Sequence, residues 1–416
     1  MQPEPLVAGK RPPTPWRPGT QTARNRGWAR SGAAVSPART TLRVLITVPH
    51  PSLPGGVAAF WETVAPEVGQ SIHIIRVGRL RDSDGLLLRA LRSLRTTSRI
   101  LRETRGSGAD LVVLNPSLRP KSLIRDGLTL LALRLARRPV LVFFHGWDPP
   151  TERLVDRYLR HLFLAVYGRA DCIAVLSSSF RVRLRSWGYT GPVALVTTVA
   201  PYPERSPRPR RLATREVGQA VRILFMARLV PGKGLEETVR ALALLRDADV
   251  NVSLVVAGVG PNRGAAEALA RNLGLTNVSF VGHVGGQVKA DLLRGSDVYV
   301  LPSSGEGMPG SVLEAMSYGL ATVVTPVGGI VDFVVDGKNA LLLDSTSPSE
   351  IAEKLATLCQ DAGLRQSIGE NARHLAVRAF LPDAVGGRMA RLFVDTVDNV
   401  LTHDPSWLDE VTLPDA

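Results

Sequence analysis

The 416-residue chain has only two cysteines, Cys172 and Cys359, which lie far apart in apolar surroundings. Two such cysteines exclude a disulfide framework, and we expect both to be buried free thiols. No run of about 20 uncharged apolar residues is present, so the sequence predicts no membrane-spanning helix. The N-terminus also lacks the apolar stretch of a secretory signal. We therefore expect a cytoplasmic protein.

Acidic residues are scarce in the first half of the chain. Residues 1–210 carry 33 Lys and Arg against 13 Asp and Glu, whereas residues 211–416 carry 18 against 24. This asymmetry predicts an anionic partner for the first half only. The hydrophobic content of 44% excludes a disordered class of protein, and the length favours two domains.

The first half divides into a basic arm and a first domain. Residues 1–40 are rich in Pro, Arg, Gly and Ser, with Glu4 as the single acid. They are interpreted as a disordered basic arm, as a stretch that is not translated, or as a transit peptide. From residue 41 to residue 200, buried-type apolar runs such as 42–48 alternate with helical stretches. This alternation predicts a doubly wound α/β sheet with helices on both faces.

The second half repeats the same alternation. Residues 201–218 are rich in Pro and Arg and are predicted to be a linker. A second doubly wound domain is predicted over residues 219–381. We expect the helical stretch 382–401 to pack back on the first domain, and residues 402–416 to be a loose acidic tail. Two such domains in tandem place a cleft between the carboxyl ends of their strands.

Two carboxylates stand out in the second domain. A strand at 298–301 runs into a Ser/Gly/Pro loop and then a helix from about Gly310 to Tyr318, an arrangement typical of an anion site. Glu306 lies in the loop and Glu314 lies one turn into the helix. Carboxylates repel phosphate and accept hydrogen bonds from sugar hydroxyls, so this stretch indicates a nucleotide-sugar site.

Two cations accompany the carboxylates. In the segment FMARLVPGKG, Arg228 follows a strand and Lys233 precedes a helix. Cations that converge at such a turn can hold a diphosphate and neutralise charge on a leaving group. The alternative is a solvated loop with ordinary surface charges.

Four segments in order carry a resemblance to a known family. They are PGGV at 54–57, FHGWD at 144–148, ARLVPGKG at 227–234 and EGMPGSVLEAM at 306–316. The chain resembles a retaining glycosyltransferase of family 4, with the GT-B architecture of two Rossmann-like domains that face each other across a cleft. The resemblance covers about residues 42–401. One departure is Ala227, where the family usually has a glycine.

The resemblance implies an activity and a set of site residues. It implies transfer of a hexosyl unit from a nucleoside diphosphate sugar to an acceptor hydroxyl with retention of configuration, in bacterial polysaccharide or glycolipid synthesis. By resemblance, Glu306, His145, Arg228 and Lys233 take part in catalysis. The residues implied in donor binding are Gly55, Gly56, Arg228, Lys233, Gly258, Gly282, Gly310, Ser311, Val312 and Glu314. Trp147 and Asp148 are candidates for acceptor binding, although Trp147 is as readily interpreted as a packed aromatic.

No Asp-x-Asp motif occupies a plausible metal site, so we expect a metal-independent reaction without a cofactor. Other GT-B enzymes, such as a sugar-nucleotide epimerase or a glycoside phosphorylase, are an alternative. A non-catalytic nucleotide-sugar or polyanion-binding protein is a more remote one. The donor's base and sugar, the acceptor and the oligomeric state leave no trace in the sequence.

A basic amphipathic stretch at 85–105 offers a candidate contact with the anionic partner. Its leucines share one helical stripe and its arginines fall to one side. Such a helix can lie on anionic lipid at the inner face of a membrane, or its stripe can be a core face edged by arginines. A saccharide or lipid-linked acceptor would fit the first interpretation. Nucleic acid is not expected, because no known binding module is present.

Overall fold

The computed structural model describes residues 41–50, 56–78, 86–203, 219–401 and 404–410, with the side chains of residues 86–90 left out. The predicted arm at 1–40 lies outside the described residues, as do residues 204–218 of the predicted linker and parts of the tail. The same holds for Gly55, one of the predicted donor-binding glycines.

A six-stranded parallel sheet forms the core of the first half. Its strands, in sheet order, are β2 (Ser71–Val77), β1 (Arg43–Pro49), β3 (Leu111–Leu114), β5 (Val140–Phe144), β7 (Cys172–Val175) and β8 (Val193–Leu195). The central strands are buried on both faces, as their continuous Val, Leu, Ile and Phe runs predict. A short parallel pair, β4 (Ser117–Leu118) and β6 (Gly146–Trp147), extends beyond the carboxyl ends of β3 and β5.

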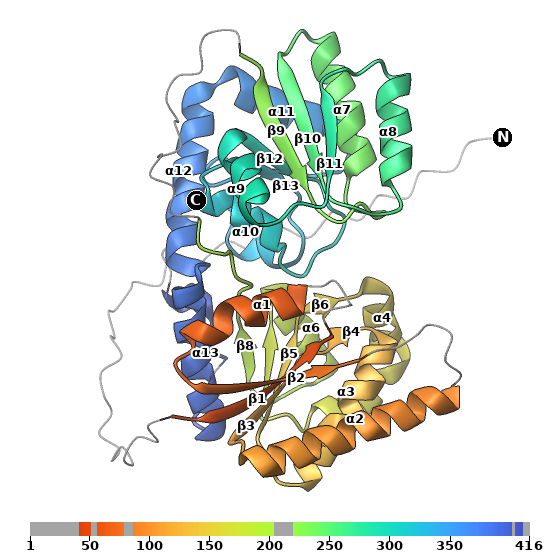
Figure 1. The fold of residues 1–416 in the computed structure, drawn as a ribbon, viewed down its shortest axis with the longest axis vertical. Coiled ribbons are helices and arrows are strands. Elements are labelled where there is room, and N and C mark those ends of the chain that lie inside the picture. Colours follow the sequence, from red (N-terminus) through yellow and green to blue (C-terminus); the bar gives the residue numbers. More distant parts are fainter. Residues whose placement is uncertain (1–40, 51–55, 79–85, 204–218, 402–403, 411–416) are drawn as a thin grey trace, which may run out of the picture. The chain divides into compact units, whose positions relative to one another are not determined.

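The helices of the first half lie beside this sheet in two groups. The helix α2 contacts α3, and α3 contacts α5, whereas α1 contacts the last long helix, α13 (Figure 1). A π-helical turn at Val155–Leu159 joins α4 to α5. Their bounds are α1 (Gly56–Val64), α2 (Leu86–Ser107), α3 (Pro120–Leu135), α4 (Pro149–Leu154), α5 (Arg160–Tyr167), α6 (Ser178–Trp187) and α13 (Pro382–Val397).

A second six-stranded parallel sheet forms the core of the second half. Its strands, in sheet order, are β11 (Val278–Gly282), β10 (Val252–Ala257), β9 (Val221–Met226), β12 (Val298–Leu301), β13 (Ala321–Val324) and β14 (Leu341–Leu342). Its helices are α7 (Leu235–Asp247), α8 (Arg263–Asn272), α9 (Gly286–Gly295), α10 (Gly310–Ser317), α11 (Pro348–Gln360) and α12 (Ala362–Ala379). The prediction of two doubly wound α/β sheets is confirmed.

The end of the chain returns to the first sheet. The helix α13 packs against α1 and the 3₁₀ turn Ala65–Glu67. Gly386 in α13 lies directly against Glu67 of this turn, since an added Cβ on Gly386 would lie 2.6 Å from the Cβ of Glu67.

Residues 404–410 are packed, so the prediction of a loose tail is wrong for this part. The backbone N–H of Leu195 in β8 donates to Pro405 (2.8 Å), and Asp404 pairs with Arg185. Trp407 is 2% exposed and contacts Phe380. A single tryptophan in an acidic segment anchors it in an aromatic cluster, which charge composition alone does not reveal.

Candidate active site

The second sheet has one switch point in its strand order, between β9 and β12. In doubly wound sheets, ligands bind outside the carboxyl ends of the strands at such a point. The loop after β9 carries Arg228 and Lys233, and the loop after β12 carries Glu306. The topology therefore brings the predicted cations and the first carboxylate to the one edge where a ligand is expected.

Glycines hold these two loops against each other. Gly232 and Gly234 both have positive φ, and a Cβ on Gly234 would lie 2.3 Å from the carbonyl oxygen of Pro302. The N–H of Ser304 donates to the carbonyl of Gly232 (2.8 Å). Only glycine permits this backbone conformation and this close approach, so the PGKG segment fixes the position of Lys233 over the 302–306 loop.

Lys233 and Glu306 form a direct ion pair. The Nζ of Lys233 lies 2.5 Å from Oε1 of Glu306, and each side chain is 13% exposed. In the free protein the two predicted donor-site residues therefore neutralise each other. The carboxylate also holds the lysine in one orientation.

Glu314 also has a cationic partner, which sequence reasoning missed. The Nζ of Lys289 in α9 lies 2.8 Å from Oε1 of Glu314, whose side chain is 16% exposed. This half-buried carboxylate is therefore already paired within the protein. Lys289 lies one turn into the helix after the FVGHV loop, which is the only sequence signal that could have marked it.

The start of α10 is only partly open to a ligand. The N–H of Val312 donates to the carbonyl of Pro309 (3.1 Å). The hydroxyl of Ser311 bonds the buried Tyr299 hydroxyl (2.7 Å), which also donates to Met226 at the end of β9. Burial raises the pKa of Tyr299 well above its usual value. Ser311 thus ties α10 to β9, and the helix N-terminus at Gly310 stays beside the switch point.

The other predicted donor residues lie at neighbouring strand ends. Gly258 donates its N–H to the carbonyl of Gly282 (2.7 Å), joining the ends of β10 and β11. A Cβ on Gly258, whose φ is +146°, would lie 1.9 Å from the carbonyl oxygen of Ala227. Arg228 is exposed just after β9. Gly56 begins α1 in the first half, with open space where a Cβ would stand.

His145 is held at the carboxyl end of β5 by a residue that sequence reasoning missed. Asn115 donates from Nδ2 to the carbonyl of Thr47 (2.8 Å), so its Oδ1 faces Trp61 Nε1 (3.0 Å) and His145 Nε2 (2.9 Å). Because an amide oxygen only accepts, the His145 proton lies on Nε2 and Nδ1 is left as an acceptor. Burial lowers the pKa of His145 to about 3.

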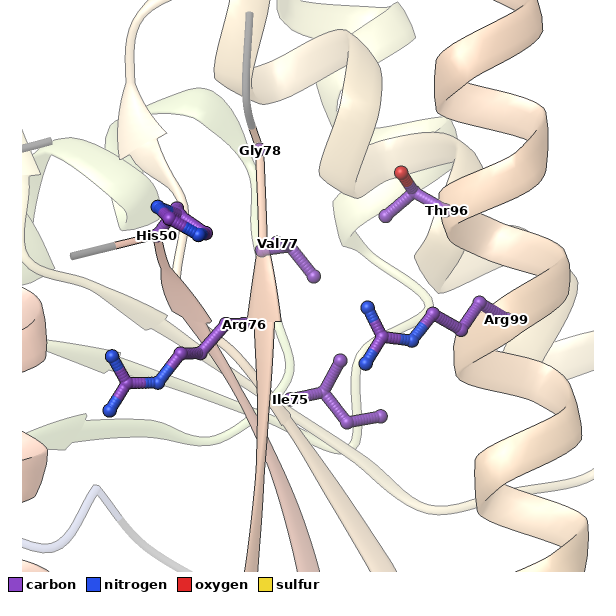
Figure 2. A pocket seen from close by; sticks show the side chains of 7 residues that line it. All are labelled: His50, Ile75, Arg76, Val77, Gly78, Thr96 and Arg99. Atoms are coloured by element: carbon purple, nitrogen blue, oxygen red, sulfur yellow. The ribbon is translucent and has the colours of Figure 1, made fainter. Parts of the chain in front are cut away.

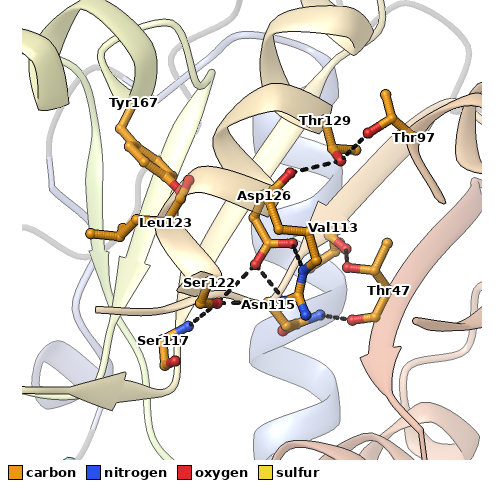
Figure 3. A network of polar contacts seen from close by, with 11 residues as sticks. Thr47, Thr97, Val113, Asn115, Ser117, Ser122, Leu123, Asp126, Thr129 and Tyr167 are labelled. Atoms are coloured by element: carbon orange, nitrogen blue, oxygen red, sulfur yellow. Dashed lines mark hydrogen bonds and ion pairs between the residues drawn. The ribbon is translucent and has the colours of Figure 1, made fainter. Parts of the chain in front are cut away.

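A second polar network supports the backbone next to His145. Figure 3 shows the chain of contacts from Asp126 in α3 through Ser122 to the backbone N–H of Ser117. Asp126 is buried and paired with Arg125 (2.7 Å). Ser117 in β4 pairs with the residue that follows His145, so this network fixes the turn that presents the imidazole.

The two predicted acceptor residues have structural partners. The Trp147 ring stacks on Phe180 (centroids 4.4 Å apart), and its Nε1 donates to Glu152 (2.7 Å). The Asp148 carboxylate caps α4 by accepting from the N–H (3.1 Å) and hydroxyl (2.7 Å) of Thr151. The structure therefore places Trp147 in a packed aromatic cluster and Asp148 in a helix cap.

Contacts join the carboxyl edges of the two sheets. The N–H of Ser178 at the start of α6 donates to Asp332 (2.8 Å), and burial raises the pKa of this carboxyl. A Cβ on Gly307 would lie 2.9 Å from the carbonyl oxygen of His145. The loop that carries Glu306 therefore meets the strand end that carries His145.

A cavity of about 210 Å³ lies near the ends of β1 and β2 (Figure 2). Figure 2 shows His50 and Arg76 on one side of β2 and Arg99 on the other. Arg76 pairs with Glu62 (3.6 Å) and Arg99 with Glu103 (3.7 Å). The two arginines lie on opposite sides of β2 and do not converge on one point of the cavity.

The described ranges hold neither a cluster of metal-ligating side chains nor a helix of the membrane-spanning kind. No group of three His, Cys, Asp or Glu side chains there could hold a metal ion. No described helix is long and apolar enough to cross a membrane. Cys172 is buried and Cys359 half-buried, both as free thiols, and burial raises their pKa values to about 12 and about 11.

The two parallel sheets with their helices form a GT-B architecture. Residues 212–375 match the family model "Glycosyl transferases group 1". This range contains Arg228, Lys233, Lys289, Glu306 and Glu314. The second half of the chain is thus similar to this group over the residues matched.

Relatives and solved structures agree with this assignment. The chain is 32% identical over 162 residues to an uncharacterized glycosyltransferase, MJ1069, of Methanocaldococcus jannaschii, over 38% of this chain and 41% of that one. It is 27% identical over 272 residues to the uncharacterized glycosyltransferase YqgM of Bacillus subtilis, over 64% and 74%. It is 24% identical over 277 residues to the putative colanic acid biosynthesis glycosyltransferase WcaL of Salmonella typhimurium, over 64% and 67%.

The structure of Anabaena Alr3699/HepE in complex with UDP and glucose superposes with a TM-score of 0.66 at 18% identity, over 85% of this chain and 99% of that one. At this identity the likeness shows the fold alone. The match to MJ1069 spans about two fifths of that relative's length.

Proposed function

We propose that this chain is a glycosyltransferase that moves a hexosyl unit from a nucleoside diphosphate sugar to an acceptor hydroxyl with retention of configuration. The proposal rests on two ion pairs at the carboxyl edge of the second sheet, Lys233–Glu306 and Lys289–Glu314. Each places a cation and a carboxylate side by side, which suits a ligand that carries both a diphosphate and hydroxyl groups. The solved relative that binds UDP and glucose shares the fold and adds support.

Each residue has a role in the proposed reaction. The bond between the anomeric carbon and the diphosphate oxygen breaks, a bond to the acceptor oxygen forms on the same face, and the acceptor proton passes to the departing phosphate. Lys233 and Arg228 stabilise the charge on the leaving diphosphate, together with the N-terminus of α10. Glu306 faces the donor sugar and Glu314 the ribose.

His145 contributes as a neutral hydrogen-bonding group in this proposal. With its proton on Nε2 held by Asn115, its Nδ1 can accept from a sugar or acceptor hydroxyl. Its lowered pKa keeps the imidazole uncharged at neutral pH, so it does not compete with Lys233 and Arg228 for the diphosphate.

The remaining parts of the proposal concern conditions and pathway. We expect the reaction to proceed without a metal ion or cofactor. The similarity to a putative colanic acid biosynthesis enzyme supports a place in polysaccharide or glycolipid synthesis. The excess of Lys and Arg in the first 210 residues supports an acceptor at, or linked to, an anionic membrane surface.

A thermal-shift screen followed by a transfer assay tests the proposal. We expect uridine, guanosine or adenosine diphosphate, alone or with its common sugars, to raise the melting temperature, with and without EDTA. Glu306→Ala should keep nucleotide binding and lose transfer, whereas Arg228→Ala and Lys233→Ala should weaken nucleotide binding. Unchanged turnover in all three variants would show that the site is elsewhere. An epimerised donor without transfer would identify the chain as an epimerase instead.

A further inference from the structure

An apolar groove lies on the outer side of the first half, between α3 and the segment that runs from α4 through the π-helical turn into α5. It has a volume of about 310 Å³. Aliphatic and aromatic side chains make up most of its lining, among them Leu123, Ile124, Leu128, Leu131, Leu154 and Leu162. It lies apart from the switch point where the donor site is proposed.

The groove is bordered by apolar side chains that point to solvent. On α3, residues Ile124, Leu128, Leu131 and Leu135 recur at helical spacing, and Ile124 is 66% exposed. On the other wall, Leu154, Tyr158 and Leu162 recur every four residues, and Leu162 is 61% exposed. A contiguous apolar surface of this kind on a folded domain marks an interaction site.

The opposite wall contains the π-helical turn at Val155–Leu159. Turns of this type appear frequently at functional sites. Val155, inside the turn, is buried, whereas its neighbour Tyr158 is 67% exposed. The irregular turn therefore contributes Val155 and Leu159 to the lining of the groove and exposes Tyr158 between them in the sequence.

Cations surround the groove. The exposed basic side chains on its helices and their ends are Arg119, Lys121, Arg137, Arg153, Arg157, Arg160 and Arg169. The acids of the same segments have cationic partners: Glu152 and Asp156 pair with Arg183 (2.6 and 3.8 Å), Asp126 is buried against Arg125, and Asp148 pairs with Arg119 of the rim (3.8 Å). The groove thus presents an apolar floor inside a positively charged rim.

The positive charge of the rim indicates which partner the groove can bind. A second copy of the chain in a two-fold contact would bring the same arginines against one another. The chain's own segment 1–40 is basic, with Glu4 as its only acid, and would be repelled. An anionic lipid surface complements both features, because acyl chains accept the apolar side chains while headgroups meet the arginines.

We propose that the groove between α3 and α5 is the surface by which this protein binds an anionic phospholipid bilayer. Ile124, Leu128, Leu162 and Tyr158 enter the acyl boundary, and Arg153, Arg157 and Arg160 contact the headgroups. The inference rests on the membrane contact proposed above and assigns it to a surface of its own. The neighbouring helix α2, which meets α3 through Thr97 and Thr129 (2.9 Å), has exposed Leu91 and Leu94 and is a rival surface.

Sedimentation of the full chain with vesicles tests the assignment. We expect co-sedimentation with phosphatidylglycerol vesicles, little with phosphatidylcholine vesicles, and a decrease as salt is raised. The triple variant Ile124→Ser, Leu128→Ser, Leu162→Ser should bind phosphatidylglycerol vesicles at least about tenfold more weakly, since three inserted apolar groups are lost. Arg157→Glu with Arg160→Glu should weaken binding and reduce its salt dependence.

Matched controls use exposed apolar residues elsewhere. Val182→Ser and Val288→Ser, at 67% and 60% exposure, should leave vesicle binding unchanged. The proposal is overturned if the wild type does not sediment with phosphatidylglycerol vesicles, or if the groove variants bind as well as the wild type. It is also overturned if only reversal of Arg92 and Arg95 in α2 abolishes binding, or if the wild type is a dimer that the groove variants make monomeric.

No donor is needed in this assay, so its outcome is separate from the proposed reaction. Groove variants should retain the nucleotide-dependent thermal shift of the wild type. A failure of the transferase proposal would instead appear as the absence of that shift in every protein tested.

Discussion

The ion pair between Lys233 and Glu306 should be strongly coupled in the absence of any ligand. The two charged atoms lie 2.5 Å apart, and each side chain is 13% exposed. At an effective dielectric constant of about 20, their attraction is on the order of 6 kcal/mol before the cost of desolvation. Removing one partner leaves the other charge uncompensated, and we expect Lys233→Met to lower the free energy of unfolding by about 3–5 kcal/mol.

A double-mutant cycle measures this coupling. Glu306→Gln alone should cost a similar amount, and the combined variant should be more stable than the sum of the two losses by at least about 2 kcal/mol. Unfolding by urea, without nucleotide, gives each free energy. The matched control is the pair Arg246 and Asp247, 2.7 Å apart but 44% and 61% exposed, whose coupling should stay below about 1 kcal/mol.

Equal coupling in the two cycles would refute the reasoning. It would mean that solvent screens Lys233 and Glu306 as it does a surface pair, and that the free site is not held by its own charges. The Lys233→Met variant also tests nucleotide binding. A nucleoside diphosphate should raise the melting temperature of the wild type more than that of Lys233→Met, because the variant lacks the cation that the diphosphate would engage.

Three further predictions follow from single residues. Burial lowers the pKa of His145 to about 3, whereas this pKa is about 6.5 in the unfolded chain. As the pH falls, the unfolded state therefore binds the proton first. The contribution of His145 to stability is complete above about pH 6.5, and the free energy of unfolding should fall toward pH 3 by at most about 1.4 kcal/mol per pH unit. Calorimetry at several pH values should find a shallower fall for His145→Gln. Trp407→Ala should lower the free energy of chemical unfolding by about 3–5 kcal/mol. Trp407→Phe should lower it clearly less, because the buried Nε1 has no hydrogen-bond partner among the described residues that the phenylalanine would lose. Equal losses in the two variants would contradict this prediction. Gly258→Ala should destabilise, since its Cβ would lie 1.9 Å from the carbonyl oxygen of Ala227, whereas Gly264→Ala in α8, with open space, should stabilise by about 0.5–1 kcal/mol.

The strands were predictable because buried parallel strands leave a continuous apolar run. The predicted strand at 298–301 coincides with β12, and the predicted helix from Gly310 agrees with α10 to within one residue at its end. Glycine-rich turns were equally visible, since Gly232 and Gly234 have positive φ, a backbone conformation that glycine adopts readily. These signals are local, so the sequence alone carries them.

Partners from distant segments were not predictable. Lys289 meets Glu314 across 25 residues and Asn115 meets His145 across 30, and neither contact has a periodic pattern. The cap that Asp148 forms on α4 is also invisible in the sequence pattern that marked this residue as an acceptor candidate.

The return of the chain's end to the first sheet bears on how the protein is made. The edge strand β8 is extended by residues around Pro405, and α1 packs against α13. During synthesis the first sheet emerges from the ribosome long before the segments that complete its edge and cover α1. We expect this sheet to remain incompletely covered until translation ends. A premature stop before Pro382 would therefore destabilise the half of the protein that was made first.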